Sequence, residues 1–256
     1  MLQKIMDAVR ECSRIILNAD RSHADTETKG GRFNNLVTAY DKAMQDALHD
    51  RLMQIAPEAH FVGEEEDIHD SIEHGLAFIV DPIDGTTNFV KDYKASVVSV
   101  AVTKDGEQYM GVVYNPYLDE MFYAVKGEGA YCNGERIHVS GLPLHQGLML
   151  FGSASYYPEL IDESFRMLRW YFDRSMDMRR SGSAAWDLCC IAAGRVELFC
   201  ELRLQPWDFA AGSLIIAEAG GTVGTADGAP LDLSRPCSVL AYGTGVKPED
   251  LYPTGA

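Results

Sequence analysis

A strongly apolar run that ends in two aspartates is the feature that most constrains how this chain can fold. The run reads FIVDPIDGTT over residues 78–87. Its apolar residues favour a short strand buried in a sheet. Such a strand would deliver Asp81 and Asp84 to its C-terminal end, with Pro82 restraining the backbone between them and Gly85 permitting a sharp turn. The chain must therefore build a sheet with two acids at the end of an inner strand.

The same run can be interpreted chemically in two ways. Two carboxylates three residues apart can hold a hard cation, and the carbonyl oxygen of Ile83 can supply another ligand. Gly85 and Thr86 would then begin a short helix whose free N–H groups and positive dipole end favour a phosphate. Alternatively, the segment is only a turn in which Asp84 caps that helix. The run by itself does not decide between them.

Three further acidic positions are ordinary when each is taken alone. Three acids, residues 64–66, follow an apolar run, where like charges repel unless a cation or solvent relieves them. An exposed acidic loop explains these three residues equally well. Asp208 lies in the first turn of an apolar helix, and Asp41 precedes another, and an acid at a helix start is common.

The first half of the chain predicts two helices followed by strands. Apolar residues recur at helical spacing over residues 2–17 and 43–55, and the polar, glycine-containing residues 25–35 between them predict a mobile loop. Short apolar runs bounded by turn residues predict strands at residues 60–62, 77–80, 96–102, 110–114 and 121–125.

Past Gly134 the pattern changes to strands that alternate with helices. Strands are expected at residues 148–151, 196–200 and 238–242, and helices at residues 158–172, 183–193 and 207–219. No repeat or linker separates the halves. We therefore expect an α/β fold in layers, formed by one domain over residues 1–256 with an α+β subdomain at about 1–140 and an α/β subdomain at about 141–256.

The net charge narrows the class of partner. Lys and Arg number 22 against 38 Asp and Glu, a formal charge of −16, which repels nucleic acid and anionic membrane surfaces. An anionic phosphate substrate would also be repelled unless divalent cations neutralise some of the carboxylates. The N-terminus has charges where a signal peptide needs an apolar run, and the chain has no stretch typical of a membrane span. We expect a cytoplasmic protein.

The cysteines and histidines predict no site of their own. The six cysteines include no CxxC pair and mostly lie in apolar surroundings, which favours reduced, structural thiols. The seven histidines form no ligand pattern and are interpreted as surface or packing residues. Hydrolysis assisted by divalent cations needs neither a catalytic histidine nor a cysteine that forms a phosphoenzyme.

Taken together, six segments resemble the inositol monophosphatase family of metal-dependent, lithium-sensitive phosphatases. The resemblance extends from about residue 5 to residue 243. In chain order the segments are LVTAYD, FVGEEE, DPIDGTTNF, GEGAYCNG, SGSAAWDL and PWDFAAGSLIIAEAGG. The pairing of DPIDGTT with PWDxAAGxxxxxEAGG is highly specific. The resemblance implies an alternating α-β-α-β-α sandwich of the inositol monophosphatase and fructose-1,6-bisphosphatase type, and a homodimer.

The resemblance also implies roles for particular residues. The metal ligands would be Glu64, Asp81, the carbonyl of Ile83, Asp84 and Asp208, holding two or three Mg²⁺ ions, with Asp84 bridging two of them. Asp41 and Thr86, together with Glu64, would activate a water, and Glu65 would be an accessory group. The phosphate and the sugar-like hydroxyls would contact Asp84, Gly85, Thr86, Gly182, Ala184 and Glu201.

The expected function is the Mg²⁺-dependent hydrolysis of inositol 1-phosphate or a related polyol phosphate. Relatives in the family suggest other substrates: fructose 1,6-bisphosphate, NADP, 3′-phosphoadenosine 5′-phosphate or histidinol phosphate. Glu201 favours a neutral polyol, since a carboxylate accepts hydrogen bonds from hydroxyls and repels a second phosphate. A non-catalytic regulatory binding protein is the alternative from another class.

Two departures from the family pattern leave roles open. The segment at residues 29–34 is unusual in content, so a part in holding a third metal is in doubt. Trp186 and the pair Cys189 and Cys190 give their helix unusual side chains, which either alter the substrate pocket or belong to the core.

Overall fold

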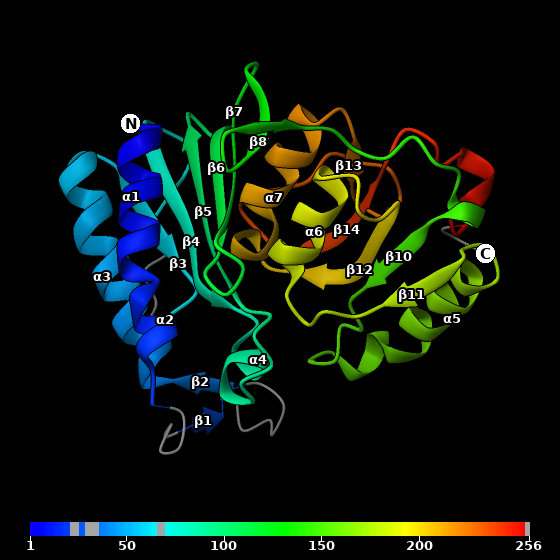
Figure 1. Ribbon diagram of the computed structural model, residues 1–256, viewed down its shortest axis with the longest axis horizontal. Helices are drawn as coiled ribbons and strands as arrows, with labels where there is room; N and C mark the ends of the chain where they lie inside the picture. Colours follow the sequence, from blue (N-terminus) through cyan, green and yellow to red (C-terminus); the bar gives the residue numbers. More distant parts are fainter. Residues whose placement is uncertain (21–25, 29–35, 66–69, 254–256) are drawn as a thin grey trace.

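The described residues form five layers in the order helix, sheet, helix, sheet, helix (Figure 1). The computed structural model describes residues 1–20, 26–28, 36–65 and 70–253. This arrangement confirms the layered α/β fold predicted from the sequence.

The larger sheet has seven strands in the order β3-β4-β5-β6-β7-β8-β9. Only β3 and β4 pair in parallel, and every later neighbour is antiparallel. Short turns join the strands from β5 onward, whereas α4 (Thr86–Val90) lies between β4 and β5. The strands are β3 (His60–Gly63), β4 (Leu76–Asp84), β5 (Val97–Lys104), β6 (Glu107–Asn115), β7 (Glu120–Val125), β8 (Gly129–Cys132) and β9 (Glu135–Ile137). A separate antiparallel pair is formed by β1 (Thr26–Thr28) and β2 (Leu36–Thr38).

Three N-terminal helices supply the outer layer on this sheet: α1 (Leu2–Cys12), α2 (Arg14–Asn18) and α3 (Ala39–Ile55). Helices α1 and α3 contact each other, while α1 contacts β6 and α3 contacts β4. Their apolar faces and one face of the sheet bury a common core that includes Val9, Leu48 and Phe78. The expected first helix is thus two helices, since Ser13 ends α1 and caps α2.

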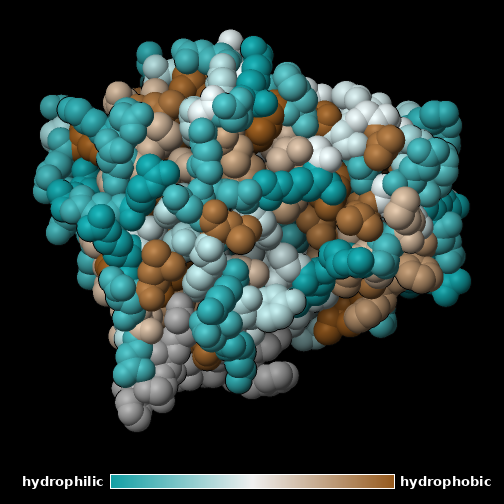
Figure 2. Space-filling model, in the orientation of Figure 1, coloured by the Kyte–Doolittle hydropathy of each residue, from teal (hydrophilic) through white to brown (hydrophobic). Residues whose placement is uncertain are grey.

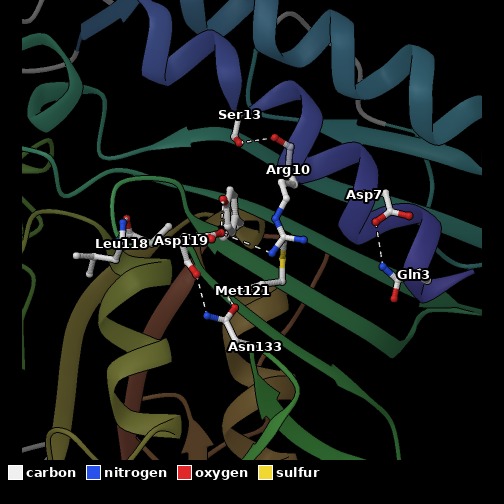
Figure 3. A network of polar contacts seen from close by, with 10 residues as sticks. Gln3, Asp7, Arg10, Ser13, Leu118, Asp119, Met121 and Asn133 are labelled. Atoms are coloured by element: carbon white, nitrogen blue, oxygen red, sulfur yellow. Dashed lines mark hydrogen bonds and ion pairs between the residues drawn. The ribbon is translucent and has the colours of Figure 1, made fainter.

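Polar contacts fix α1 against the turn between β6 and β7 (Figure 3). The Arg10 guanidinium lies 3.6 Å from the Asp119 carboxylate, which also accepts a hydrogen bond of 2.8 Å from the Tyr114 hydroxyl. Asn133 donates to the backbone carbonyl of Asp119. Exposed ion pairs of this kind contribute at most about 1 kcal/mol, so the network sets the helix position more than it stabilises the fold.

The middle layer consists of α6 (Ala184–Ala192) and α7 (Pro206–Glu218), which touch both sheets. Burial on all sides explains why both helices are apolar around almost their whole circumference. Helix α7 also approaches β6 very closely: a Cβ added at Gly111 would lie 2.6 Å from the Ala211 carbonyl oxygen. The core between the sheets therefore depends on small residues at this crossing.

The second sheet has five strands in the order β11-β10-β12-β14-β13, with α5 (Ile161–Phe172) against its outer face. Strand β10 is parallel to both of its neighbours, and β14 is antiparallel to both of its own. The strands are β10 (Leu148–Phe151), β11 (Asp177–Arg179), β12 (Leu198–Leu204), β13 (Thr222–Gly224) and β14 (Cys237–Tyr242). Single 3₁₀ turns lie at Leu144–Gln146, Pro158–Leu160 and Pro248–Asp250.

Several predicted elements need correction. The strand expected at residues 196–200 is β12, which begins at Leu198 and continues to Leu204 because β14 pairs with it past a bulge. The loop expected at residues 25–35 contains β1, and its remaining residues lie outside the described ones. Strands β8, β9, β11 and β13 were not predicted, since three or four residues without alternation leave no periodic signal.

The surface and the cysteines add two observations. Figure 2 shows that the viewed face is mostly hydrophilic, with hydrophobic residues in separate groups. All six cysteines are free thiols, four of them buried, in agreement with the structural role predicted for them. Within the described part of the chain, no helix is both long enough and apolar enough to cross a membrane.

Candidate active site

The residues predicted to carry chemistry meet in one pocket between the larger sheet and the N-terminal ends of α6 and α7. The cavity has a volume of about 130 Å³. Ten of the predicted residues line it: Glu64, Asp81, Ile83, Asp84, Gly85, Thr86, Gly182, Ala184, Glu201 and Asp208. Segments more than a hundred residues apart in the sequence are therefore brought to one place.

A β-bulge at the end of β4 puts the two aspartates of the central run on the same side. Asp81 pairs with Ser99 and Asp84 pairs with Val97, so three steps along β4 match two along β5. In a regular strand, residues three apart point to opposite faces. The extra residue in the bulge cancels this difference, and a bulge is also where an inner strand tolerates a proline such as Pro82.

Carboxylates from three elements converge beside this bulge. One oxygen from each of Asp81, Asp84 and Asp208 lies within 4.8 Å of the others, and Asp208 comes from the first turn of α7. Burial, with the charges of Glu64, Asp84 and Asp208, holds the pKa of Asp81 well above its ordinary value. Burial also raises the pKa of Asp84 to about 6 and that of Asp208 well above its ordinary value. The cluster therefore repels itself unless protons or cations neutralise it.

Glu64 reaches the same cluster from the neighbouring strand. It directly follows β3, which pairs in parallel with β4, and its backbone N–H donates to the carbonyl of Val80. Parallel pairing places the ends of β3 and β4 side by side, so Glu64 lies next to Asp81. The side chains of the two residues are in hydrogen-bonding contact.

Asp84 is held by the N-terminus of α6. Its Oδ2 accepts a hydrogen bond of 2.7 Å from the Ser183 hydroxyl and one of 2.6 Å from the Ala185 N–H. These two donors occupy one carboxylate oxygen and orient the other. Asp81 lies beside the same acids, and the bridging role expected of Asp84 stays a prediction.

Asp41 and Thr86 form the second functional pair, although 45 residues separate them. The Thr86 hydroxyl donates to Asp41 Oδ1 over 3.0 Å. The other oxygen of Asp41 accepts from both the backbone N–H and the hydroxyl of Thr38, which caps α3. Burial raises the pKa of Asp41 despite these hydrogen bonds. Thr86 begins α4 (Thr86–Val90) and lines the pocket, whereas Asp41 lies behind it.

Glu201 lies on the opposite wall and was misplaced by the sequence, because it belongs to β12 and does not follow it. Its Oε1 accepts a hydrogen bond of 3.0 Å from the Ala154 N–H. A Cβ added at Gly152 would collide with the Glu201 carboxylate, so a larger residue there would force that carboxylate to move. Burial raises the pKa of Glu201 to about 7.

Two predicted residues have other surroundings. The backbone N–H of Glu65 donates to the Gln45 side chain over 2.8 Å, and Glu65 is buried without lining the described cavity. An accessory role for Glu65 stays a prediction. Trp186 packs edge-on against Phe122 of β7 and is not part of the cavity wall, so the core interpretation of this residue holds. The segment at residues 29–34 lies outside the described residues.

Sequence reasoning did not single out several residues of the pocket. Ser183 and Asp187 occur inside the quoted segment SGSAAWDL, but no local pattern marks their side chains as part of the site. Tyr156 and Arg180 complete the rim. The charges of Glu64, Asp208 and Glu201 all act on the Tyr156 phenol, whose pKa burial raises to about 12.

The five layers and the carboxylate cluster define a class of α/β proteins with an acidic pocket suited to divalent cations. The chain belongs to the inositol monophosphatase family, whose model matches residues 1–252. It is 36% identical over 224 residues to the Nus factor SuhB of Pasteurella multocida, covering 87% of this chain and 84% of that protein.

Solved structures agree with this assignment. The extragenic suppressor protein suhB of Bartonella henselae is 31% identical with a TM-score of 0.89, over 95% of this chain and 94% of that one. SaIMPase-II with bound inositol monophosphate, from Staphylococcus aureus, is 29% identical with a TM-score of 0.81, over 97% and 91% of the chains. An IMPase/NADP phosphatase complexed with Mg²⁺ and phosphate is 26% identical with a TM-score of 0.82, over 98% and 90%.

The donor set fits a hard divalent cation. The available ligands are carboxylate and carbonyl oxygens, the atoms that Mg²⁺ prefers, with no cysteine or histidine lining the described pocket. Burial, together with the charges of neighbouring acids, raises the pKa values of Asp81, Asp84 and Asp208, and a divalent cation would neutralise this excess of negative charge.

This excess charge predicts an unusual pH dependence of the metal-free protein. The raised folded-state pKa values of Asp84, about 6, and Glu201, about 7, mean that the folded state binds protons more tightly than the unfolded chain. The stabilisation is therefore present at low pH and lost as pH rises through these values. We expect Tm in a chelator to fall by at least about 3 °C between about pH 5.5 and pH 7.5. Excess Mg²⁺ should abolish the part of the fall that arises at Asp84, and an equal fall with and without Mg²⁺ would contradict the interpretation.

Proposed function

We propose that this protein is a Mg²⁺-dependent phosphomonoesterase that hydrolyses inositol 1-phosphate or a related polyol phosphate with water as the nucleophile. The observation that carries the proposal is the meeting of two sets of residues at one cavity, which all of them but Asp41 line. One set is the carboxylate cluster of Asp81, Asp84 and Asp208, and the other is the pair Asp41 and Thr86. Phosphate esters resist hydrolysis because the nucleophile meets a dianion, and catalysis needs charge neutralisation and in-line positioning.

The carboxylate cluster provides the cation sites. Glu64, Asp81, Asp84, Asp208 and the Ile83 carbonyl would together hold the Mg²⁺ ions. When bound, such ions neutralise the phosphate and lower the pKa of a water. Ser183 and the Ala185 N–H keep the Asp84 carboxylate in one orientation for this task.

Asp41 and Thr86 would direct the attacking water. The Thr86 hydroxyl donates a hydrogen bond to Asp41. The Thr86 oxygen therefore keeps lone pairs that can accept a hydrogen bond from a water in the pocket. Asp41, buried and raised in pKa, is suited to take up the proton that the water releases through Thr86. The N–H groups of Gly85 and Thr86 at the start of α4 would bind the phosphate oxygens.

The leaving-group side favours a neutral polyol. Glu201 lines this wall and its Oε1 is already oriented by Ala154, so its other oxygen can accept from a substrate hydroxyl. The similar SaIMPase-II structure contains inositol monophosphate, which has such hydroxyls. Substrates with a second phosphate, such as fructose 1,6-bisphosphate, would meet repulsion from this carboxylate.

A substrate panel tests the proposed function. Purified protein is assayed for phosphate release from inositol 1-phosphate, fructose 1,6-bisphosphate, NADP, 3′-phosphoadenosine 5′-phosphate, histidinol phosphate and 4-nitrophenyl phosphate, with Mg²⁺ and with a chelator. We expect Mg²⁺-dependent hydrolysis with inositol 1-phosphate preferred. Absence of phosphate release from every ester would refute the enzymatic function.

Replacing Glu201 by glutamine should change selectivity more than catalysis. The amide keeps one acceptor but loses the charge. We therefore expect kcat/KM for inositol 1-phosphate to fall by an amount that corresponds to a loss of about 1–3 kcal/mol in transition-state stabilisation. Hydrolysis of 4-nitrophenyl phosphate, which lacks hydroxyls, should change little. Equal losses on both substrates would assign Glu201 to the fold or the metal site, and the paired kinetic constants distinguish these outcomes.

A second function is favoured by the names of the relatives. Nus factor SuhB proteins are 35–36% identical to this chain, so we propose a binding role in transcription beside catalysis. The test is whether this chain replaces the Escherichia coli Nus factor SuhB, and whether a catalytically inactive Asp81→Asn variant does so equally well. Replacement by neither form would refute the binding role.

Lithium inhibition, a homodimer and the number of ions, two or three, also remain predictions of the family resemblance. Titration with lithium at millimolar concentrations and light scattering of the purified protein would test the first two.

A further inference from the structure

We propose that Asp187 is a second hydroxyl-accepting carboxylate of the pocket, which together with Glu201 selects substrates whose leaving group carries free hydroxyls. This inference rests on the phosphomonoesterase function proposed above. Asp187 lies in the first turn of α6 and lines the same cavity as Asp84 and Glu201.

Asp187 is buried with one oxygen unsatisfied. The residue is only 2% exposed, and its Oδ1 has no hydrogen-bond partner, whereas its carboxylate also contacts the Ser181 hydroxyl. The other buried side-chain atoms without a partner, among the described residues, are hydroxyls of threonine and serine. A hydroxyl can rotate toward a distant acceptor or water, but a buried carboxylate oxygen needs a donor, and leaving it without one destabilises the folded state.

Asp187 lies close to the place that the leaving group of the substrate would occupy. The charges of Asp84 and Glu201 both act on it, so it lies near the metal-binding acids as well as the wall that faces the polyol. A hydroxyl of a bound polyol is the kind of donor that would satisfy Oδ1. The guanidinium of Arg180, on the rim, acts on both Asp187 and Glu201 and reduces the repulsion between them. The positive end of the α6 dipole also favours an acid in this turn.

A competing role would act through a turn of the backbone. The Ser181 hydroxyl donates to the Ser183 carbonyl over 3.0 Å, and the Ser183 hydroxyl donates to Asp84. If Asp187 only held this turn through Ser181, its loss would disturb Asp84 and slow every substrate alike. Contact with a leaving-group hydroxyl instead predicts a loss confined to polyol substrates, so the two roles give different kinetics.

The experiment compares wild-type protein with Asp187→Ala on three kinds of ester in saturating Mg²⁺. The esters are inositol 1-phosphate, its analogues with one hydroxyl replaced by hydrogen, and 4-nitrophenyl phosphate. We expect Asp187→Ala to lower kcat/KM for inositol 1-phosphate by about 10–100-fold and for the aryl phosphate by less than about threefold. With wild-type protein, kcat/KM for one deoxy analogue should be lower than that for inositol 1-phosphate by a similar factor. With Asp187→Ala, removal of the same hydroxyl should lower kcat/KM no further. Asp162→Ala, an exposed acid in the first turn of α5, is the matched control and should leave all rates unchanged.

Asp187→Asn, which keeps the size and one acceptor oxygen, should show an intermediate loss on inositol 1-phosphate. It also replaces Asp187→Ala in the same comparison if the alanine variant does not fold, as judged by its Tm. Equal losses on inositol 1-phosphate and the aryl phosphate would overturn the proposal in favour of the turn-holding role, and no loss on either would overturn it altogether. Wild-type protein that hydrolyses none of the esters would refute the proposed function itself, which is a distinguishable result.

Discussion

Asp81→Asn is expected to lower kcat for inositol 1-phosphate by at least about 10³-fold, a loss of about 4 kcal/mol in transition-state stabilisation. Asp81 lies beside Glu64 and within 4.8 Å of carboxylate oxygens of Asp84 and Asp208. An asparagine at this position removes the central negative charge and places either an amide oxygen or N–H groups toward the cation. Steady-state kinetics across a Mg²⁺ titration measure both the loss of kcat and the weaker Mg²⁺ dependence.

The same substitution should stabilise the metal-free protein. Burial and three neighbouring acids raise the pKa of Asp81, so removing its charge removes a repulsion from the folded state. Tm in a chelator should therefore rise while activity falls, a combination that general damage to the fold cannot produce. Asp50→Asn, an exposed acid on α3, is the control and should alter neither. Activity above about a tenth of wild type would refute the central role of Asp81.

Asp41→Asn is expected to lower kcat by about 10²–10⁴-fold while the Mg²⁺ dependence changes little, since Asp41 acts on the water through Thr86 and lies outside the metal cluster. The amide cannot take up a proton, and its nitrogen cannot accept hydrogen bonds from Thr38 or Thr86. Pre-steady-state and steady-state kinetics at several pH values would measure the loss. The exposed Asp46→Asn on the same helix is the matched control.

A double variant makes this test sharper. If Asp41 and Thr86 act as one unit, Asp41→Asn combined with Thr86→Ala should be hardly slower than the slower single variant. Losses that add in full would mean that the two residues act independently. Tm values of the four proteins show whether the loss of the α3 cap, which Asp41 shares with Thr38, contributes to the effect.

Much of the candidate site was predictable because its residues occur in short segments with their own local logic. The apolar run before Asp81 identifies a buried strand, and the acids at Asp208 and Asp41 occupy first turns of helices, as expected. Other contacts have no local signal. Ser183 donates to Asp84 across 99 residues of sequence, and nothing in a run of small residues indicates which hydroxyl will meet which acid.

Errors in the predicted elements have the same origin. Glu201 was assigned to the end of a strand because the apolar run stops at Cys200, yet pairing with β14 extends β12 to Leu204. Tertiary pairing thus overrides the local hydrophobic pattern, as it often does for strands. The short strands β11 and β13 exist only because a longer neighbour offers them free backbone groups.

By itself, the sequence determined the kinds of ligand atoms, the order of the longer helices and strands, and membership of the inositol monophosphatase family, since these depend on residue type and local spacing. The tertiary structure alone decided the geometry. The bulge between β4 and β5 turns Asp81 and Asp84 to one side, and the approach of α3 to α4 joins Asp41 to Thr86. The α6 N-terminus leaves Asp187 buried with an unpaired oxygen beside the pocket. These features depend on strand register and on packing between distant segments, which local propensity does not encode.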